Sequence, residues 1–243
     1  MQQSQLLDDL HVRIDEQEVL QWLRIRPNSP AVPHVSSLLE RVRAATRPRA
    51  LYRECSIDRH ESDGIWIEGL KFSSPALAVL LGSSDRVIAY VVTCGRELDA
   101  VVPQDGSSLE KLALDTIGNL ILQASCQEME QRIAERHGFG MTGRIGPGAG
   151  DGELWPIEQQ AELFGLLGDT ASTIGVELTK DHLMLPIKSF SGFLFATEDD
   201  FSACQLCQSQ ECPMRESAFS PALRSALAQG KPADESPSPI KTP

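Results

Sequence analysis

The segments RIGPGAGDGE, from Arg144 to Glu153, and MLPIKSFSGFLF, from Met184 to Phe195, frame the second half of this sequence. Glycine lets a backbone adopt positive φ or approach another group closely, so the first segment predicts a turn that admits a ligand. The same segment is also typical of a plain surface connection. Apolar residues at strand spacing in the second segment predict a packed strand. We expect the two segments to lie side by side and to form the functional surface.

Regular elements are predicted around these two segments. Apolar residues recur at helical spacing from Ser108 to His137, and Gly138 is a typical stop. A second helix is expected from Pro156 through Leu167. The later residues give three expected extended segments, which are Gly175 to Leu178, Leu183 to Leu185 and Phe190 to Phe195.

The first half mixes helices and strands without regular alternation, which favours an α+β fold over a doubly wound sheet. RVIAYVVT, Arg86 to Thr93, is the clearest strand because it is an apolar β-branched run. The other predicted elements are helices over Asp15–Arg26, Val35–Ala45 and Phe72–Leu81, and strands over Tyr52–Ile57 and Ile65–Ile67. We divide the chain into an N-terminal part of one domain (1–107), its core (108–203), a cysteine cluster (204–215) and a polar tail (216–243) whose end, 231–243, is expected to be disordered.

Composition excludes several function classes. The chain has 243 residues and a formal net charge of -12, with 41% hydrophobic residues. Such an acidic balance argues against binding nucleic acid or an anionic membrane surface. The polar, acidic start is not a secretory signal, and the apolar runs are too short to span a bilayer. We therefore expect a cytoplasmic protein whose six cysteines are free or metal-bound.

The order of segments from Leu109 to Phe195 resembles the reactivation domain of cobalamin-dependent methionine synthase. That domain has an Arg-x-x-Pro-Gly-Tyr loop, a helix, an Ile-Gly-x-x-Leu-Thr segment and a Pro-x-x-Ser-Val-Ser-Gly segment. Here the matching stretches are RIGPGA, IGVELT and PIKSFSG. The first half and the cysteine tail are similar to free-standing relatives of that domain. The resemblance implies a C-shaped α+β domain around a twisted antiparallel sheet, with flanking long helices.

The resemblance also implies a site for S-adenosylmethionine next to the corrin of a partner. A guanidinium such as that of Arg144 can grip a carboxylate through two hydrogen bonds. The implied ligand-facing and corrin-facing residues are Arg144, Gly146, Pro147, Gly148, Ala149, Ser189, Ser191 and Gly192. Strand spacing favours a core role for the phenylalanines of that last segment.

Some positions differ from the family pattern. Ala149 stands in place of the loop tyrosine, and Phe201 is the nearest aromatic to a second ligand-facing tyrosine. The acidic residue expected on the long helix falls near Gln123, with Glu128 as the nearest carboxylate. These differences concern the aromatic and acidic contacts that the resemblance implies for S-adenosylmethionine.

Three cysteines lie within nine residues in CQLCQSQEC. Cys204, Cys207 and Cys212 have a spacing that suits an iron–sulfur cluster or a zinc ion, with a fourth ligand from elsewhere. Free, oxidisable thiols are the alternative interpretation. Cys94 is a candidate fourth ligand, although a cysteine at a strand end is more often a small buried apolar residue.

Three hypotheses follow. The first is an accessory factor that docks on a corrinoid methyltransferase and supports reductive remethylation of its cobalt from S-adenosylmethionine, acting as a methyltransferase component. The second is a non-enzymatic iron–sulfur redox module, and the third is a zinc-bearing scaffold. The sequence has no Asp-x-His-x-x-Gly motif, so cobalamin is expected on a partner, which is a corrinoid protein or a methionine synthase without its own activation domain. A flavodoxin or ferredoxin would supply electrons.

Overall fold

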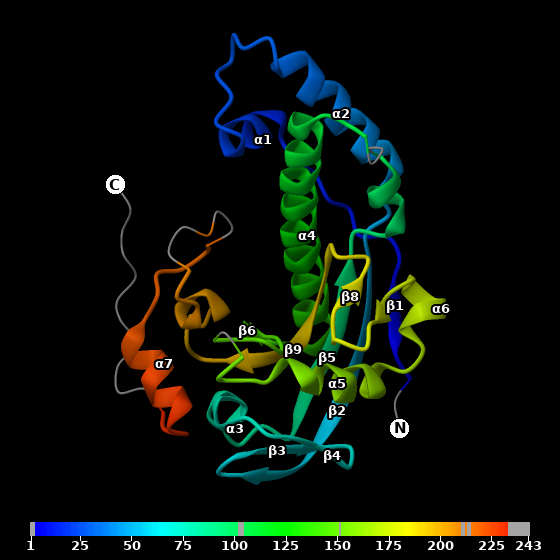
Figure 1. Ribbon diagram of the computed structural model, residues 1–243. Coiled ribbons are helices and arrows are strands. Elements are labelled where there is room, and N and C mark those ends of the chain that lie inside the picture. Colours follow the sequence, from blue (N-terminus) through cyan, green and yellow to red (C-terminus); the bar gives the residue numbers. More distant parts are fainter. Residues whose placement is uncertain (1–2, 102–104, 151, 210–211, 213–214, 233–243) are drawn as a thin grey trace.

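A computed structural model describes residues 3–101, 105–150, 152–209, 212 and 215–232 of the chain. These residues form a seven-stranded sheet in which all the paired strands are antiparallel (Figure 1). Its order is β4-β3-β2-β5-β9-β6, and β1 pairs with β2. The strands are β1 (Gln5–Leu7), β2 (Arg49–Glu61), β3 (Gly64–Ile67), β4 (Leu70–Phe72), β5 (Arg86–Thr93), β6 (Met141–Ile145) and β9 (Ser189–Thr197). The antiparallel α+β architecture is thus confirmed.

Helices flank the sheet, and one short hairpin lies beside it. The helices are α1 (Glu16–Trp22), α2 (Val32–Ala45), α3 (Pro75–Leu81), α4 (Ser108–His137), α5 (Gln160–Leu167), α6 (Thr170–Ile174) and α7 (Pro221–Ala228). Three 3-10 turns are η1 (Arg96–Ala100), η2 (Ile157–Gln159) and η3 (Ala203–Leu206). Strands β7 (Glu177–Leu178) and β8 (Met184–Leu185) form the separate hairpin.

The centre of the sheet is β5, whose residues after Arg86 are all buried. Alternate side chains of a strand point to opposite faces, and here both faces are covered. Val87, Ala89 and Val91 join a core cluster that includes Trp155 and Phe193. The other face packs against α4 through a cluster that includes Met129. Because both faces of β5 are buried, its sequence is a continuous apolar run and does not alternate between apolar and polar residues.

Helix α4 has the bounds expected from the sequence, and its two ends are fixed by local contacts. Ser107 and Glu110 form a capping box at its start, and Gly138 adopts the left-handed conformation at its end. Its first half packs against α1 and α2, and its second half crosses the sheet (Figure 1). Since β5 pairs with β9, the segments 1–107 and 108–203 contribute to one sheet.

Several elements differ from the sequence-based expectation. Helix α2 begins at Val32, inside the predicted loop, because Pro33 fits a first helical turn, where its missing N–H costs nothing. Strand β6 occupies the start of the predicted glycine-rich connection. Helix α7 lies in the predicted polar tail, where Ser220 caps it and Leu227 is buried. Residues 233–243, most of the stretch expected to be disordered, lie outside the described residues.

No helix in the described part of the chain is long and apolar enough to cross a membrane.

Candidate functional site

The two segments that frame the second half of the sequence meet as neighbouring strands. Strand β6 pairs with β9 so that Arg144 lies opposite Leu194 and Ile145 opposite Phe193. The backbones then approach very closely where β6 ends. A Cβ atom added to Gly146 would lie 2.5 Å from the Ser191 carbonyl oxygen, so only glycine fits there without movement. The expectation that the two segments lie side by side is confirmed.

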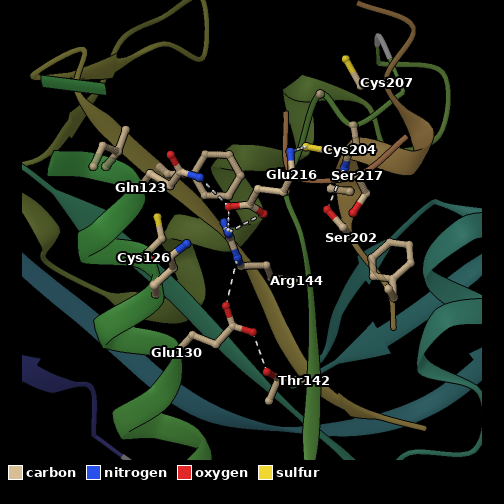
Figure 2. Close-up of a pocket in the computed structure, with 18 of the residues that line it drawn as sticks. Gln123, Cys126, Glu130, Thr142, Arg144, Ser202, Cys204, Cys207, Glu216 and Ser217 are labelled. Atoms are coloured by element: carbon tan, nitrogen blue, oxygen red, sulfur yellow. Dashed lines mark hydrogen bonds and ion pairs between the residues drawn. The ribbon is translucent and has the colours of Figure 1, made fainter. Parts of the chain in front are cut away.

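A cavity of about 750 Å³ opens beside this junction. Its walls come from the middle of α4, from β6 and the following turn, from Phe190 of β9, and from the C-terminal segment (Figure 2). The volume suits a small-molecule ligand. The residues that carry the argument below are Gln123, Cys126, Glu130, Thr142, Arg144, Cys204 and Glu216, all of which line the cavity.

Arg144 is the central charge of this cavity. Its guanidinium donates from Nε to Glu130 of α4 at 3.1 Å and from Nη2 to both carboxylate oxygens of Glu216 at 3.3 Å. Figure 2 shows the Arg144 side chain held between these two carboxylates. The Thr142 hydroxyl donates to the other oxygen of Glu130, and the Gln123 amide donates to Glu216 at 2.9 Å. The arrangement positions a cation at the wall of an otherwise mixed apolar and polar cavity.

Burial and charge set the ionisation of the groups around Arg144. Burial acts to lower the pKa of Arg144, but its ionisable neighbours Tyr90, Cys126, Glu216 and Glu130 outweigh burial and raise the pKa above its ordinary value. The guanidinium is therefore charged at every physiological pH. Burial raises the pKa of the Cys126 thiol to about 12, although Arg144 opposes the change. Cys126 is consequently a neutral thiol on the cavity wall.

The eight residues predicted to face a ligand divide into two groups. Arg144, Gly146, Pro147, Gly148 and Ala149 line the cavity. Ser189, Ser191 and Gly192 do not; they lie in β9, and all three are buried.

These three β9 residues have structural surroundings. The Ser189 hydroxyl donates to the Pro186 carbonyl at 2.7 Å and contacts the Thr93 hydroxyl at 2.9 Å. A Cβ atom on Gly192 would lie 2.3 Å from the Ile145 carbonyl oxygen, so this glycine permits the close contact of β9 with β6. Phe193 and Phe195 are core residues as expected. Phe190, also assigned to the core, is partly buried: it packs against the core cluster that includes Tyr90 and also lines the cavity.

The cysteine segment forms one edge of the cavity. Cys204 and Cys207 line the cavity, Cys212 does not, and all three side chains are half-buried. Arg215 holds this segment by donating to the backbone carbonyls of Cys204, Ser217, Cys207 and Ser209. Within the described residues, no three His, Cys, Asp or Glu side chains are grouped so that they could hold a metal ion. The three thiols are thus not gathered into the predicted metal site.

Cys94 is buried at the end of β5, and its Sγ contacts the Gly118 carbonyl oxygen at 3.5 Å. Burial raises the pKa of its thiol to about 12. This is the buried apolar role expected for a cysteine at a strand end.

The two acidic residues that contact Arg144 were not singled out by the sequence. Glu130 is the carboxylate of α4 that accepts a hydrogen bond from Arg144. Glu128, the carboxylate expected from the sequence, instead forms an ion pair with Arg132. Seven positions, two helical turns, separate Gln123 from Glu130, so the helical repeat places both on one face of α4. The helical repeat could therefore have indicated Glu130 from the position of Gln123. Glu216 carries no local signal, because it follows a segment whose path depends on Arg215.

Comparison with known proteins places this geometry on a known fold. No family model and no curated protein matches the sequence. Among solved structures, the MetH reactivation domain bound to AdoHcy is similar, with a TM-score of 0.56 and 15% sequence identity. The match covers 82% of this chain and 79% of that chain. The fold of the chain is therefore that of a methionine synthase reactivation domain, as the ordered segments predicted.

Proposed function

We propose that this chain is an accessory factor that docks on a corrinoid methyltransferase and supports reductive reactivation of its cobalt, with S-adenosylmethionine as the methyl donor. The observation that carries the proposal is the 750 Å³ cavity built around Arg144, on the fold of a reactivation domain that binds AdoHcy. Fold alone hosts many functions, so the argument rests on the cavity and its charge.

The cavity suits an adenosyl amino acid in three respects. Arg144, whose side chain is 20% exposed, offers charge-assisted hydrogen bonds to a ligand carboxylate. Phe190 and Phe201 supply apolar surface for a nucleoside base. The turn from Gly146 to Gly150 brings backbone to the cavity wall, with positive φ at Gly148 and Gly150.

The proposed chemistry needs a partner for each component. A one-electron donor of the flavodoxin or ferredoxin class reduces cob(II)alamin on the partner protein to cob(I)alamin. The reduced cobalt then takes the methyl group from the sulfonium of S-adenosylmethionine, leaving S-adenosylhomocysteine. The role of this chain is to hold the methyl donor and present it to the corrin. The partner is a corrinoid methyltransferase or a methionine synthase without its own activation domain.

Calorimetric titration with S-adenosylhomocysteine tests the ligand. The wild-type chain should bind, and Arg144→Lys should weaken binding about tenfold, because a hydrogen bond to a charged group contributes about 1.5 kcal/mol. Arg49→Lys is the matched control, since Arg49 pairs with Glu97 and does not line the cavity. No heat and no retention of the nucleoside in equilibrium dialysis would reject this form of the proposal.

Docking is tested separately, by size-exclusion chromatography of the chain mixed with a cob(II)alamin-loaded corrinoid protein. Co-elution, together with a changed cob(II)alamin spectrum, is the expected result. Separate elution at micromolar concentrations of both proteins would contradict the accessory role.

The second candidate is a redox or scaffold module that binds an iron–sulfur cluster or zinc through Cys204, Cys207 and Cys212. Its supporting observation is that one stretch of nine residues places two of these thiols on the cavity edge. Metal and sulfide analysis of anaerobically purified chain distinguishes the versions. Iron with sulfide would favour the redox module, zinc alone would favour the scaffold, and substoichiometric metal would exclude both.

A further inference from the structure

The two carboxylates at Arg144 come from different parts of the chain and differ in exposure. Glu130 stands on α4, its second oxygen accepts from the Thr142 hydroxyl, and its side chain is 21% exposed. Glu216 lies on the C-terminal segment, its two oxygens share one guanidinium nitrogen at 3.3 Å, and its side chain is 32% exposed. Arg144 and Glu130 therefore form the fixed pair, and the Glu216 contact is the long and exchangeable one.

Glu216 contacts Gln123 and Cys204 as well as Arg144, and the neighbouring Arg215 holds the same segment through four backbone carbonyls. Its backbone N–H donates to the Cys204 Sγ at 3.5 Å, and the Gln123 amide donates to its carboxylate. Both Gln123 and Cys204 line the cavity, so Glu216 lies directly across the space that a ligand would enter (Figure 2).

Charge shows why this carboxylate must leave when another arrives. One guanidinium with two carboxylates has a net charge of about -1, and Nη2 of Arg144 already donates to both oxygens of Glu216, so a ligand carboxylate at that nitrogen competes with Glu216 for the same donor. Like charges within a few ångströms of each other repel strongly when water is partly excluded. A ligand carboxylate therefore replaces Glu216 at Arg144 and does not add to it.

We propose that Glu216 is a specificity-determining residue that occupies the carboxylate position of Arg144 and yields it only to a ligand that carries its own carboxylate. This inference rests on the proposed function, because it concerns the same cavity. A nucleoside without an amino-acid group has nothing to offer Arg144 in exchange. The contact therefore selects the adenosyl amino acid over its shorter nucleoside relatives.

Calorimetry with Glu216→Gln tests the exchange, using S-adenosylhomocysteine and 5′-methylthioadenosine, which lacks the amino-acid group. The variant should bind S-adenosylhomocysteine about two- to fivefold more tightly, the size expected for an exposed ion pair, with unchanged affinity for 5′-methylthioadenosine. Glu198→Gln, the same change at an exposed residue outside the cavity lining, should alter neither. Weaker binding of S-adenosylhomocysteine by the variant would mean that Glu216 holds the ligand ammonium. An equal rise in affinity for both nucleosides would mean that the substitution only widens the cavity entrance. Either result overturns the proposal.

A ligand-free measurement separates this inference from the proposed function. In a Cys207→Ser/Cys212→Ser background, Cys204 is the only thiol that is not buried. Glu216→Gln should speed its alkylation about two- to fivefold, because the rate follows the population in which the segment is released. Faster alkylation of Cys204 without binding of either nucleoside would reject the proposed ligand but support the role of the Arg144–Glu216 contact in holding the segment. An unchanged alkylation rate would show that the Arg144–Glu216 contact does not hold the segment, and would overturn the inference.

Discussion

Replacing Gly192 by alanine should destabilise the folded chain and displace β6, which carries Arg144 into the cavity wall. An added Cβ would lie 2.3 Å from the Ile145 carbonyl oxygen, 3.0 Å from its carbon and 3.1 Å from the Gly146 Cα. All three atoms are backbone, so no side chain can rotate away. Ordinary contact starts near 3.4 Å, so β6 and β9 must separate by about 1 Å where Arg144 enters the cavity.

The expected loss of stability is about 1 to 3 kcal/mol, the usual range for forcing extra volume into a packed site. For a chain of this length, that corresponds to a fall of about 2 to 12 °C in Tm. Gly140→Ala is the matched control, because nothing lies within 4 Å of a Cβ there and its φ is not positive. Thermal unfolding followed by circular dichroism measures both variants, and S-adenosylhomocysteine affinity reports on the displaced β6.

The reasoning about this junction would be refuted if Gly192→Ala unfolded at the same temperature as Gly140→Ala. A stable Gly192→Ala that failed to bind S-adenosylhomocysteine would instead favour the original expectation that Gly192 faces the ligand.

Three further predictions concern the thiols and the segment that carries them. Native protein at pH 8 should show three thiols that react readily with a disulfide reagent, and denatured protein should show six. The reason is that Cys55, Cys94 and Cys126 are buried, whereas Cys204, Cys207 and Cys212 are half-buried. Rapid reaction of all six thiols in native protein would contradict the described core. Stability in urea should fall as pH rises from 9 towards 12, because burial raises the pKa of Cys55, Cys94 and Cys126 to about 12 while unfolded thiols ionise near 9; a flat profile would show that these thiols are not buried. Arg215→Lys should speed alkylation of Cys207 several-fold without lowering Tm by more than about 2 °C, since one ammonium cannot hold four separated carbonyls; an unchanged alkylation rate would show that Arg215 does not order the segment.

The sequence predicted the central elements well because each carries a strong local signal. The bounds of β5 follow from its apolar β-branched run, and those of α4 from its apolar residues at helical spacing and its terminal glycine. In these places local preference and burial agree, so the pattern alone was sufficient. The helix predicted from Phe72 to Leu81 instead begins at Pro75, where Ser74 caps α3, and Phe72 ends strand β4.

Elements that owe their existence to pairing were missed. Strand β6 has two glycines beside it and no apolar run, and it forms because β9 offers a free edge. Helix α7 is short and buries Leu227, and it is ordered by that burial and by the Ser220 cap. Local propensity is a weak guide wherever tertiary contacts decide the conformation.

The candidate site was predicted in part for the same reason. The turn after Arg144 was recognised from its order along the chain, and its five residues line the cavity. Glu216 lies 72 positions from Arg144, and only the folded C-terminal segment brings the two together. Ser189 and Gly192 matched the family pattern, yet in this structure they serve the packing of β9.

The replacement of the family's loop tyrosine by Ala149 does not remove aromatic surface from the cavity. Phe190 comes from β9 and Phe201 from the segment after it, and both line the cavity. Each is held by a buried ring, since Phe190 lies 6.3 Å from Tyr90 and Phe201 lies 5.9 Å from Phe195, between ring centroids. Rings fixed by packing lose little further freedom when a base stacks on them. The aromatic surface that an alanine in the turn does not provide therefore comes from other elements of the same cavity, which supports the proposal that the cavity takes a nucleoside.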